Sequence, residues 1–267
     1  MTVQALYSAA TGMTGMETKL DTIANNLANM ETTAFKRARC NFEDLLYRYE
    51  VMPGQEDSAG QRTATGISTG LGVRVSGIGT DFRQGAFKET SQPLHVAIQG
   101  DGFFKVLDPT GTTLYTRAGN FSKNANGQLV VGSASTGRLL EPPITIPQDA
   151  TDISISAEGK VTYRQAGNQN ASDAGTIELV NFINPEGLLK KGENLYAETD
   201  ASGTALTANP GQQGLGTLQQ GWLEASNVEP VSELIDLITT QRAFELNSQV
   251  VQAGDQVMQV VTNLTQG

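Results

Sequence analysis

The side chains best suited to catalysis are scarce in this chain of 267 residues. It contains one histidine, His95, and one cysteine, Cys40. A catalytic triad or a histidine metal site needs partners at set positions, and the strand-like run 94–98 around His95 offers none. Arg37 and Arg39 precede Cys40 and would favour a thiolate, but a single cysteine forms neither an internal disulfide nor a cysteine zinc site. We therefore interpret both residues as structural.

Three further patterns resemble ligand-binding motifs only in part. The run 124–127 (NANG) is similar to the start of a calcium loop, but the closing glutamate is missing because position 135 is Ser135. The glycine pairs at 70–72 and 77–79 lack the spacing of a dinucleotide-binding loop. We predict no catalytic residue, no cofactor site and no metal site. A pair of carboxylates brought together in space, as in a glycosidase, stays open at this point.

Composition excludes several classes of partner. The formal net charge is −10 and the isoelectric point is near 4.6, whereas a nucleic-acid binder needs a basic face. No run approaches the ~18 apolar residues of a membrane span, so we expect no membrane insertion. The first basic residue is Lys19, which does not fit a secretory leader, so if the protein leaves the cytoplasm we expect it to do so without a cleaved signal peptide.

Glycine and proline divide the chain into three parts. Residues 1–34 and 223–267 contain few of either, and most of the 29 glycines and 9 prolines lie between 53 and 221. Because both residues break helices and mark turns, this distribution predicts helix, a long β-rich middle, and helix.

The N-terminal segment carries an apolar residue at alternating intervals of three and four. This spacing predicts an amphipathic helix with a coiled-coil seam. The residues of this N-terminal stripe are Leu6, Ala9, Met13, Met16, Leu20, Ile23, Leu27 and Met30.

The C-terminal segment has the same spacing, and Pro230 suits its first helical turn. A second set of apolar residues upstream drifts out of register before Ala243. The residues of this C-terminal stripe are Ala243, Leu246, Val250, Ala253, Val257, Val260 and Leu264, and the upstream set is Val231, Leu234, Ile235 and Ile238.

The middle of the chain alternates short strand-like runs with turn residues. The runs 94–98 and 103–107 flank a glycine turn and predict a hairpin. We predict an α+β fold in which the terminal helices pair as a coiled coil around a central antiparallel β-rich domain and an extended connector. The predicted domains are 1–34 with 223–267 for the helices, 35–85 with 204–222 for the connector, and 86–203 for the outer β domain.

The other faces of the N-terminal helix carry few charges. Glu17, Lys19 and Asp21 are its only charged residues up to position 30, whereas a solvated coiled coil normally carries many. Small residues on those faces favour close packing on several sides. One partner helix of the same chain covers only one side, so we predict self-assembly, with both apolar stripes as the assembly interface.

Three separate motifs resemble those of the flagellar basal-body rod and hook proteins. They are 23–29 (IANNLAN) with 32–37 (TTAFKR), then 97–104 (AIQGDGFF) with 115–117 (YTR), and last 223–228 (LEASNV) with 241–245 (QRAFE). The residues carried over from the family motifs are Asn25, Asn26, Asn29, Phe35, Lys36, Ser226, Asn227, Gln241 and Arg242.

The resemblance implies a structural subunit that is not an enzyme. It implies a helical homopolymer that crosses the periplasm, transmits torque, and contacts the proximal rod proteins, the hook protein and the surrounding rings. Within the family, 42–47 (FEDLLY) and 214–221 (GLGTLQQG) look most like the distal rod. Two alternatives to a distal rod subunit stay open. One is a proximal rod or hook subunit of the same family, and the other, from a different functional class, is a peptidoglycan hydrolase.

Two positions depart from the family pattern, and one of them is Ala118, where the family commonly has aspartate. Ala34 stands where the family usually has glycine, just after the first helix. If that residue supplies a left-handed turn, alanine strains it by about 1 kcal/mol.

Overall fold

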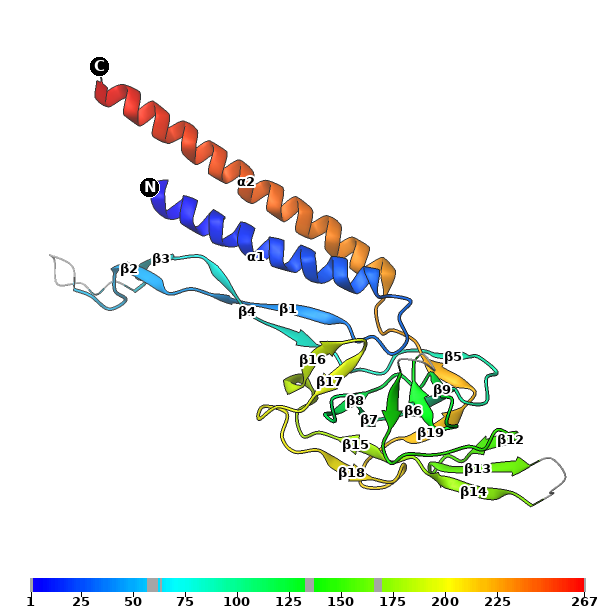
Figure 1. Ribbon diagram of the computed structural model, residues 1–267. Coiled ribbons are helices and arrows are strands. Elements are labelled where there is room, and N and C mark those ends of the chain that lie inside the picture. Colours follow the sequence, from blue (N-terminus) through cyan, green and yellow to red (C-terminus); the bar gives the residue numbers. More distant parts are fainter. Residues whose placement is uncertain (1, 57–61, 63, 133–136, 166–169, 267) are drawn as a thin grey trace. The chain divides into compact units, whose positions relative to one another are not determined.

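We describe a computed structural model of the chain, which covers residues 2–56, 62, 64–132, 137–165 and 170–266. It contains two long helices and many short strands, and every strand pair that it describes is antiparallel (Figure 1). The mixed α and β content, with a helix at each end, is therefore confirmed. The part of the predicted connector at 57–61 and 63 lies outside the described residues.

The helices are α1 (Thr2–Ala28) and α2 (Pro230–Gln266), with one short 3-10 helix, η1 (Pro185–Gly187). The strands are β1 (Ala38–Asp44), β2 (Tyr47–Val51), β3 (Ile67–Gly70), β4 (Val73–Thr80), β5 (Phe87–Glu89), β6 (Val96–Gln99), β7 (Phe103–Leu107), β8 (Thr113–Thr116), β9 (Phe121–Lys123), β10 (Leu129–Val131), β11 (Arg138–Leu140), β12 (Ala150–Ile155), β13 (Lys160–Gln165), β14 (Ser172–Thr176), β15 (Leu179–Asn181), β16 (Leu189–Gly192), β17 (Leu195–Ala197), β18 (Leu206–Ala208), β19 (Thr217–Gln220) and β20 (Trp222–Glu224).

The chain forms two compact units. The first, which we call the helical unit, comprises residues 1–28, 38–80 and 229–267. The second, which we call the β unit, comprises residues 29–37 and 81–228. The short segment 29–37 therefore belongs to the β unit, although it lies between α1 and β1 in the sequence.

In the helical unit, α1 packs against α2 on one side and against the β1–β4 ribbon on another (Figure 1). The ribbon pairs Ala38 with Thr80 at one end and Asp44 with Val73 at the other. Its Phe42 ring approaches Gly15 of α1 so closely that a Cβ on this glycine would lie 3.0 Å from the ring. The expectation that only other copies cover the remaining faces of α1 is therefore wrong for this face, because the ribbon of the same chain covers it.

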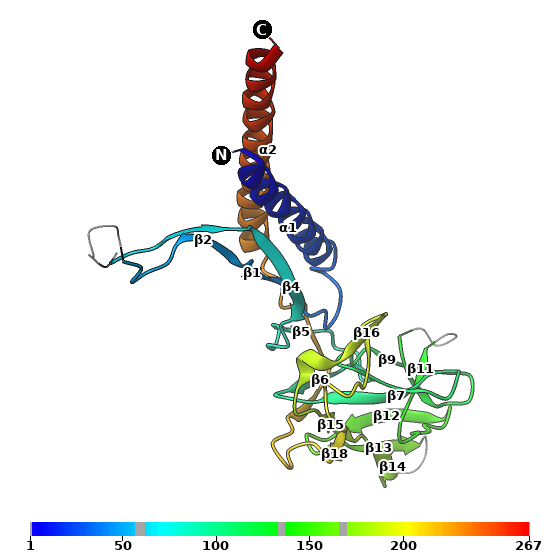
Figure 2. The ribbon, with the colours of Figure 1, turned by 90° about the vertical axis from the view of Figure 1, so that its left-hand side faces the viewer.

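The two helices run antiparallel, as contacts along their length indicate. Asn26 lies beside Glu233, Gly12 beside Asn247, and Gly254 beside Leu6. Because α2 has 37 residues and α1 has 27, the C-terminal turns of α2 extend past the start of α1 (Figures 1 and 2).

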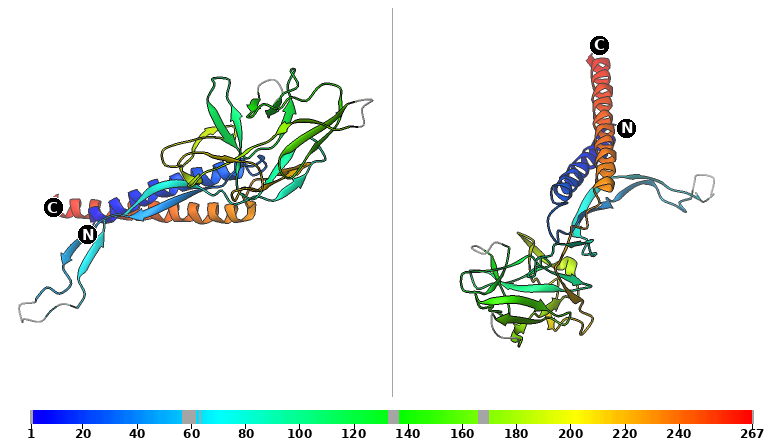
Figure 3. Two further views of the ribbon diagram at one scale, coloured as in Figure 1. Left: turned by 90° about the horizontal axis from the view of Figure 1, so that it is seen from below. Right: turned by 90° about the vertical axis from the view of Figure 1, so that its right-hand side faces the viewer.

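The β unit is built around a nine-stranded sheet with the strand order β16-β17-β8-β7-β11-β10-β9, to which β15 and β18 attach through β7. A three-stranded sheet, β12-β13-β14, and the pairs β19–β6 and β20–β5 complete the unit (Figure 3). Its largest core cluster includes Ile98, Phe104 and Leu179, all of them fully buried. Both β18 and β19, within the predicted connector 204–222, pair with strands of this unit.

The predicted hairpin between 94–98 and 103–107 is wrong. Strand β6 pairs with β19, more than 100 residues further along, whereas β7 pairs with β8, β11 and β15. The connecting glycines Gly100 and Gly102 both have positive φ angles, of 111° and 137°. These angles, which favour glycine, send the two strands into different sheets.

None of the helices within the described ranges combines the length and the apolar character needed to cross a membrane.

Candidate functional site

The contacts described between α1 and α2 involve Glu233, Asn247 and Gly254 of α2 and none of the exposed residues of the predicted C-terminal stripe. Gly12 and Gly254 allow close approach, and a Cβ on Gly254 would meet the side chain of Leu6. At the other end, Asn26 donates a hydrogen bond to Glu233 (3.2 Å), and both side chains are buried. A buried polar pair in a helix contact favours one register over its neighbours, because any slip leaves these groups without partners.

The predicted C-terminal stripe lies on a different side of α2, where it is exposed. Leu246 is 62% exposed and Leu264 is 76% exposed. We name this surface the α2 apolar face, and we define it by the exposed residues Val231, Ile235, Ile238, Leu246, Val250, Val257, Val260 and Leu264. A row of large apolar side chains on one helix, without cover from its own chain, is typical of an interaction surface.

The predicted N-terminal stripe is mostly covered. Ala9 and Ile23 are buried, and Leu6, Met13, Met16, Leu20 and Leu27 are partly buried. The side of α1 that remains exposed carries mainly small residues. We name it the α1 small-residue face; it comprises Ala10, Thr14, Glu17, Asp21, Ala24 and Ala28, and the exposed Tyr7 lies at its N-terminal end.

A buried ionic cluster in the β unit joins residues from all three sequence motifs. Glu224, the last residue of β20, accepts hydrogen bonds from Lys36 Nζ (2.6 Å) and from Arg117 Nε (2.9 Å). The backbone N–H of Gly85 also donates to it (2.9 Å). We call Lys36, Arg117 and Glu224 the motif cluster. All three side chains are at least 97% buried, so their charges depend on one another.

The cations of the motif cluster also fix nearby backbone. Arg117 donates to the carbonyl oxygens of Gly100 (2.9 Å) and Gly102 (3.1 Å) in the turn between β6 and β7. Lys36 donates to the carbonyl oxygen of Arg83 (2.7 Å). The cluster therefore joins the segment after α1, the central turn and β20.

Burial and the neighbouring charges in the motif cluster shift the pKa values of Glu224 and Lys36. Burial acts to raise the pKa of Glu224, but the neighbouring Arg117 and Lys36 outweigh it and hold this pKa below its usual value. Burial lowers the pKa of Lys36, with Glu224 opposing that effect and Arg117 adding to it.

Asn227 and Ala34 strengthen the same junction. The Asn227 side chain accepts a hydrogen bond from the backbone N–H of Arg37 (2.7 Å) and donates to the carbonyl oxygens of Asp81 (2.8 Å) and Arg83 (3.0 Å). Ala34 has a φ of 57° and donates its N–H to the carbonyl oxygen of Glu224 (2.8 Å). The left-handed turn that the family glycine implied is therefore present here with alanine.

The structure places the other motif residues in varied surroundings. Asn26 exchanges two hydrogen bonds of 2.9 Å with the backbone of Ala38, which ties the end of α1 to the start of β1. Phe35 lies under the Lys190 ammonium, at 6.0 Å from the ring centroid. Asn29 accepts a hydrogen bond from the Thr32 hydroxyl, and Ser226 accepts one from the Val228 N–H. The remaining motif residues, Asn25, Gln241 and Arg242, are exposed.

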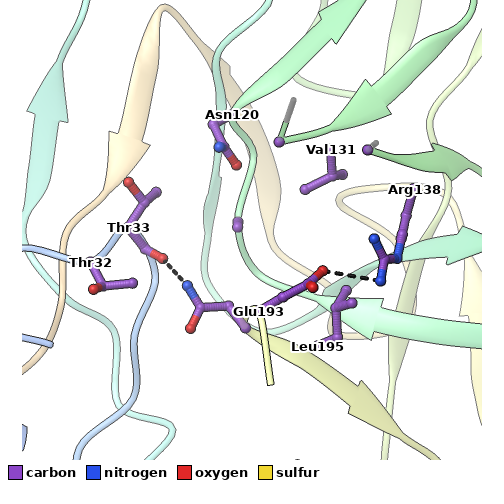
Figure 4. Close-up of a pocket in the computed structure, with 11 residues that line it drawn as sticks. Thr32, Thr33, Asn120, Val131, Arg138, Glu193 and Leu195 are labelled. Carbon is purple, nitrogen blue, oxygen red and sulfur yellow. Dashed lines mark hydrogen bonds and ion pairs between the residues drawn. The ribbon is translucent and has the colours of Figure 1, made fainter. Parts of the chain in front are cut away.

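A pocket of about 450 Å³ lies in the β unit beside segment 29–37 (Figure 4). Its charged groups are already paired, because Arg138 contacts Glu193 (3.1 Å) and Asp108 (2.9 Å). Asn194 donates to the carbonyl oxygen of Thr33 (2.8 Å) across its rim. The residues that line the pocket therefore connect loops of the β unit to segment 29–37.

The residues first considered for catalysis have structural surroundings. His95 Nδ1 lies 2.9 Å from the Thr90 hydroxyl, and burial lowers the pKa of His95. Burial raises the pKa of the Cys40 thiol in β1, which disfavours a reactive thiolate. Among the described residues, no three His, Cys, Asp or Glu side chains are grouped to hold a metal ion.

We predict that the β unit becomes less stable at alkaline pH because of Tyr196. Burial raises the pKa of Tyr196 from 10 to about 12, so the contribution of its neutral form to the free energy of unfolding is complete below pH 10 and is lost as the pH rises toward 12. Between pH 9 and 11.5, we expect wild type to lose about 2 kcal/mol more free energy of unfolding than Tyr196→Phe. Urea unfolding followed by the fluorescence of Trp222, the only tryptophan, measures this difference. Equal losses in the two proteins would contradict the prediction.

Three family models match the chain. One described as "Flagella basal body rod protein" matches residues 6–36, and one described as "Flagellar hook protein FlgE/F/G D1 domain" matches residues 97–163. A third, "Flagellar basal body rod FlgEFG protein C-terminal", matches residues 219–264. The two terminal helices, the motif cluster and these three matches together assign the chain to the class of flagellar rod and hook proteins.

Full-length relatives narrow this class. The flagellar basal-body rod protein FlgG of Caulobacter vibrioides is 46% identical over 98% of this chain and 99% of its own length. FlgG of Agrobacterium fabrum is 43% identical over 97% and 98% of the two chains. FlgG of Borreliella burgdorferi is 39% identical over 98% of each. The chain belongs to the FlgG family of flagellar basal-body rod proteins.

Family membership establishes a structural rod subunit of the flagellar basal body, in a family of structural proteins rather than enzymes. Such a subunit assembles with other components of the rod, hook and basal body.

Proposed function

We propose that this protein forms the distal rod, by self-assembly into a rigid helical tube that carries motor torque across the periplasm to the hook. The observation that carries the proposal is the exposed α2 apolar face. Each large apolar side chain on this face adds about 1.5–3 kcal/mol when it is fully buried, so its burial between copies favours polymerisation.

The proposed contacts join two different surfaces, so that each copy leaves one surface free for the next. Such heterologous contacts propagate as an open helix when the rotation between copies does not close a ring. In the assembled rod, we expect α1 and α2 to pair as a coiled coil with neighbouring helices. The exposed stripe from Leu246 to Leu264 in α2 would supply most of that assembly interface, because the predicted stripe from Leu6 to Leu27 in α1 is mostly covered within the chain.

The remaining parts of the proposed subunit provide stiffness. Residues 35–85 and 204–222 would form the connector, and residues 86–203 the outer domain that braces the helices. At its ends the tube would meet the proximal rod proteins and the hook protein, and its outer surface would face the ring proteins.

Removing α1 tests the proposal. We expect a variant that lacks residues 2–28 to form no tubes at concentrations that assemble the full chain, because it lacks one of the two helical surfaces. Segment 29–37 is retained because it belongs to the β unit. Electron microscopy of both proteins measures tube formation, and Trp222 fluorescence shows whether the β unit is folded. Tubes from the shortened chain, or no tubes from the full chain, would contradict the proposal.

A further inference from the structure

One cation interrupts the α2 apolar face. Arg242 lies between Ile238 and Leu246 at intervals of four residues, so the three side chains share one side of the helix. Ile238, Arg242 and Leu246 are all exposed. Arg242 occupies the position at which the two apolar sets of the C-terminal sequence change register.

Arg242 has no carboxylate partner among the described residues of its own chain. If the α2 apolar face is buried in the rod, the guanidinium is buried with it. A buried charge without a partner costs several kcal/mol, so the surface that covers this face must supply an anion.

The α1 small-residue face carries two such anions. Glu17 and Asp21 are exposed, lie one helical turn apart and form no ion pair within the described ranges. Like charges at this spacing destabilise a helix by about 0.2–0.5 kcal/mol, which a cation between them would relieve. On either side of them, Ala10, Thr14, Ala24 and Ala28 leave room for large side chains.

We infer that the α2 apolar face of one copy docks on the α1 small-residue face of a second copy, and that Arg242 sets the register by binding Glu17 and Asp21. This inference rests on the proposed self-assembly. Large apolar side chains meet small ones, and a planar guanidinium with several donors can bind two adjacent carboxylates.

Charge reversal in two separate chains tests the contact. In one chain Arg242→Glu places like charges together, and in the other Glu17→Arg with Asp21→Arg does the same from the opposite side. Like-charge contacts cost several kcal/mol, so we expect the critical concentration for polymerisation of each variant alone to rise by at least about 100-fold.

An equal mixture of the two variants should polymerise close to the wild-type concentration. In that mixture every reversed α2 face meets a reversed α1 face of the other variant, and every native face meets a native one. A role of Arg242 within its own chain would not be rescued by mixing. Asp255→Arg is the matched control, because it reverses an exposed charge on another side of α2 and should leave polymerisation unchanged.

The outcomes separate this inference from the proposed function. Sedimentation and electron microscopy measure polymer, and circular dichroism checks that each variant is folded. Normal polymerisation of Arg242→Glu, or failure of the mixture, overturns the register contact while wild-type tubes still support self-assembly. If the wild-type chain itself forms no tubes, the proposed function fails first.

Discussion

Replacing Val250 and Val257 together with serine is expected to raise the critical concentration for polymerisation about tenfold while the chain stays folded. Both side chains lie on the α2 apolar face and are about half exposed, at 47% and 48%. The other half of each side chain is already covered in the monomer, and the exposed half would be buried only when a second copy docks.

The expected size of the effect follows from the area lost. Burying a fully exposed valine side chain stabilises a contact by about 1.5 kcal/mol or more, and each of these side chains has about half of its surface left to bury, so two replacements remove about 1.5 kcal/mol. Because 1.4 kcal/mol is a factor of ten, the critical concentration should rise by about 10-fold. Valine and serine have similar helix propensities, so α2 should keep its helical signal in circular dichroism.

The control changes the same helix on a different side. Gln252 and Gln259 have the same spacing of seven residues and are also exposed, and their replacement by serine should leave polymerisation within about twofold of wild type. Sedimentation across a concentration series measures both variants. Equal polymerisation of the valine and glutamine variants would show that the α2 apolar face is not an assembly surface.

The helices were the most predictable part of this protein. Apolar spacing and the scarcity of glycine and proline predicted both, and Pro230 begins α2 as expected. The same spacing could not predict which surface each stripe meets. An apolar stripe gives the same pattern whether its partner is in the same chain or in another copy. In α2, the side that meets α1 instead uses residues such as Asn247 and Gly254, which carry no apolar signal.

Strand pairing was predictable only where it is local. Strand β7 pairs with β8, the next strand along the chain, across a turn at 108–111 in which proline and glycine are local signals. The partner of β6 is β19, and no local signal marks a pairing between strands that distant in sequence. Glycines at 100 and 102 predict a turn equally well whether the chain returns as a hairpin or leaves for another sheet.

The motif cluster was predictable in part. Lys36 was identified from its motif, but its partners Arg117 and Glu224 lie far along the chain and were not assigned as site residues. One signal was present in the sequence. Only 17% of residues are charged, and Lys36, Arg117 and Glu224 each lie inside one of the three motifs. The motifs also contain Asp101, Arg242 and Glu245, so the sequence alone could not select the three charges that meet.

Replacing Glu224 with glutamine is expected to destabilise the β unit strongly. Glutamine keeps the shape but removes the charge, and leaves Lys36 and Arg117 buried without an anion. Loss of one partner from a buried ion pair costs about 3–5 kcal/mol. For a unit of this size that cost corresponds to a fall in Tm of about 6–20 °C, measured by Trp222 fluorescence during heating. Because the pKa of Glu224 is held below 4.5, the difference from wild type should shrink as the pH falls below that value.

Two comparisons decide whether the cluster acts as a unit. Asp173→Asn removes one partner of an exposed ion pair with Lys160 (3.0 Å) in the same unit, and should cost less than about 1 kcal/mol. Combining Glu224→Gln with Lys36→Met removes a buried cation along with the anion, so the double variant should lose less stability than the two single losses added together. If Glu224→Gln costs no more than Asp173→Asn, or the double variant shows simple additivity, the buried charges do not hold the junction together.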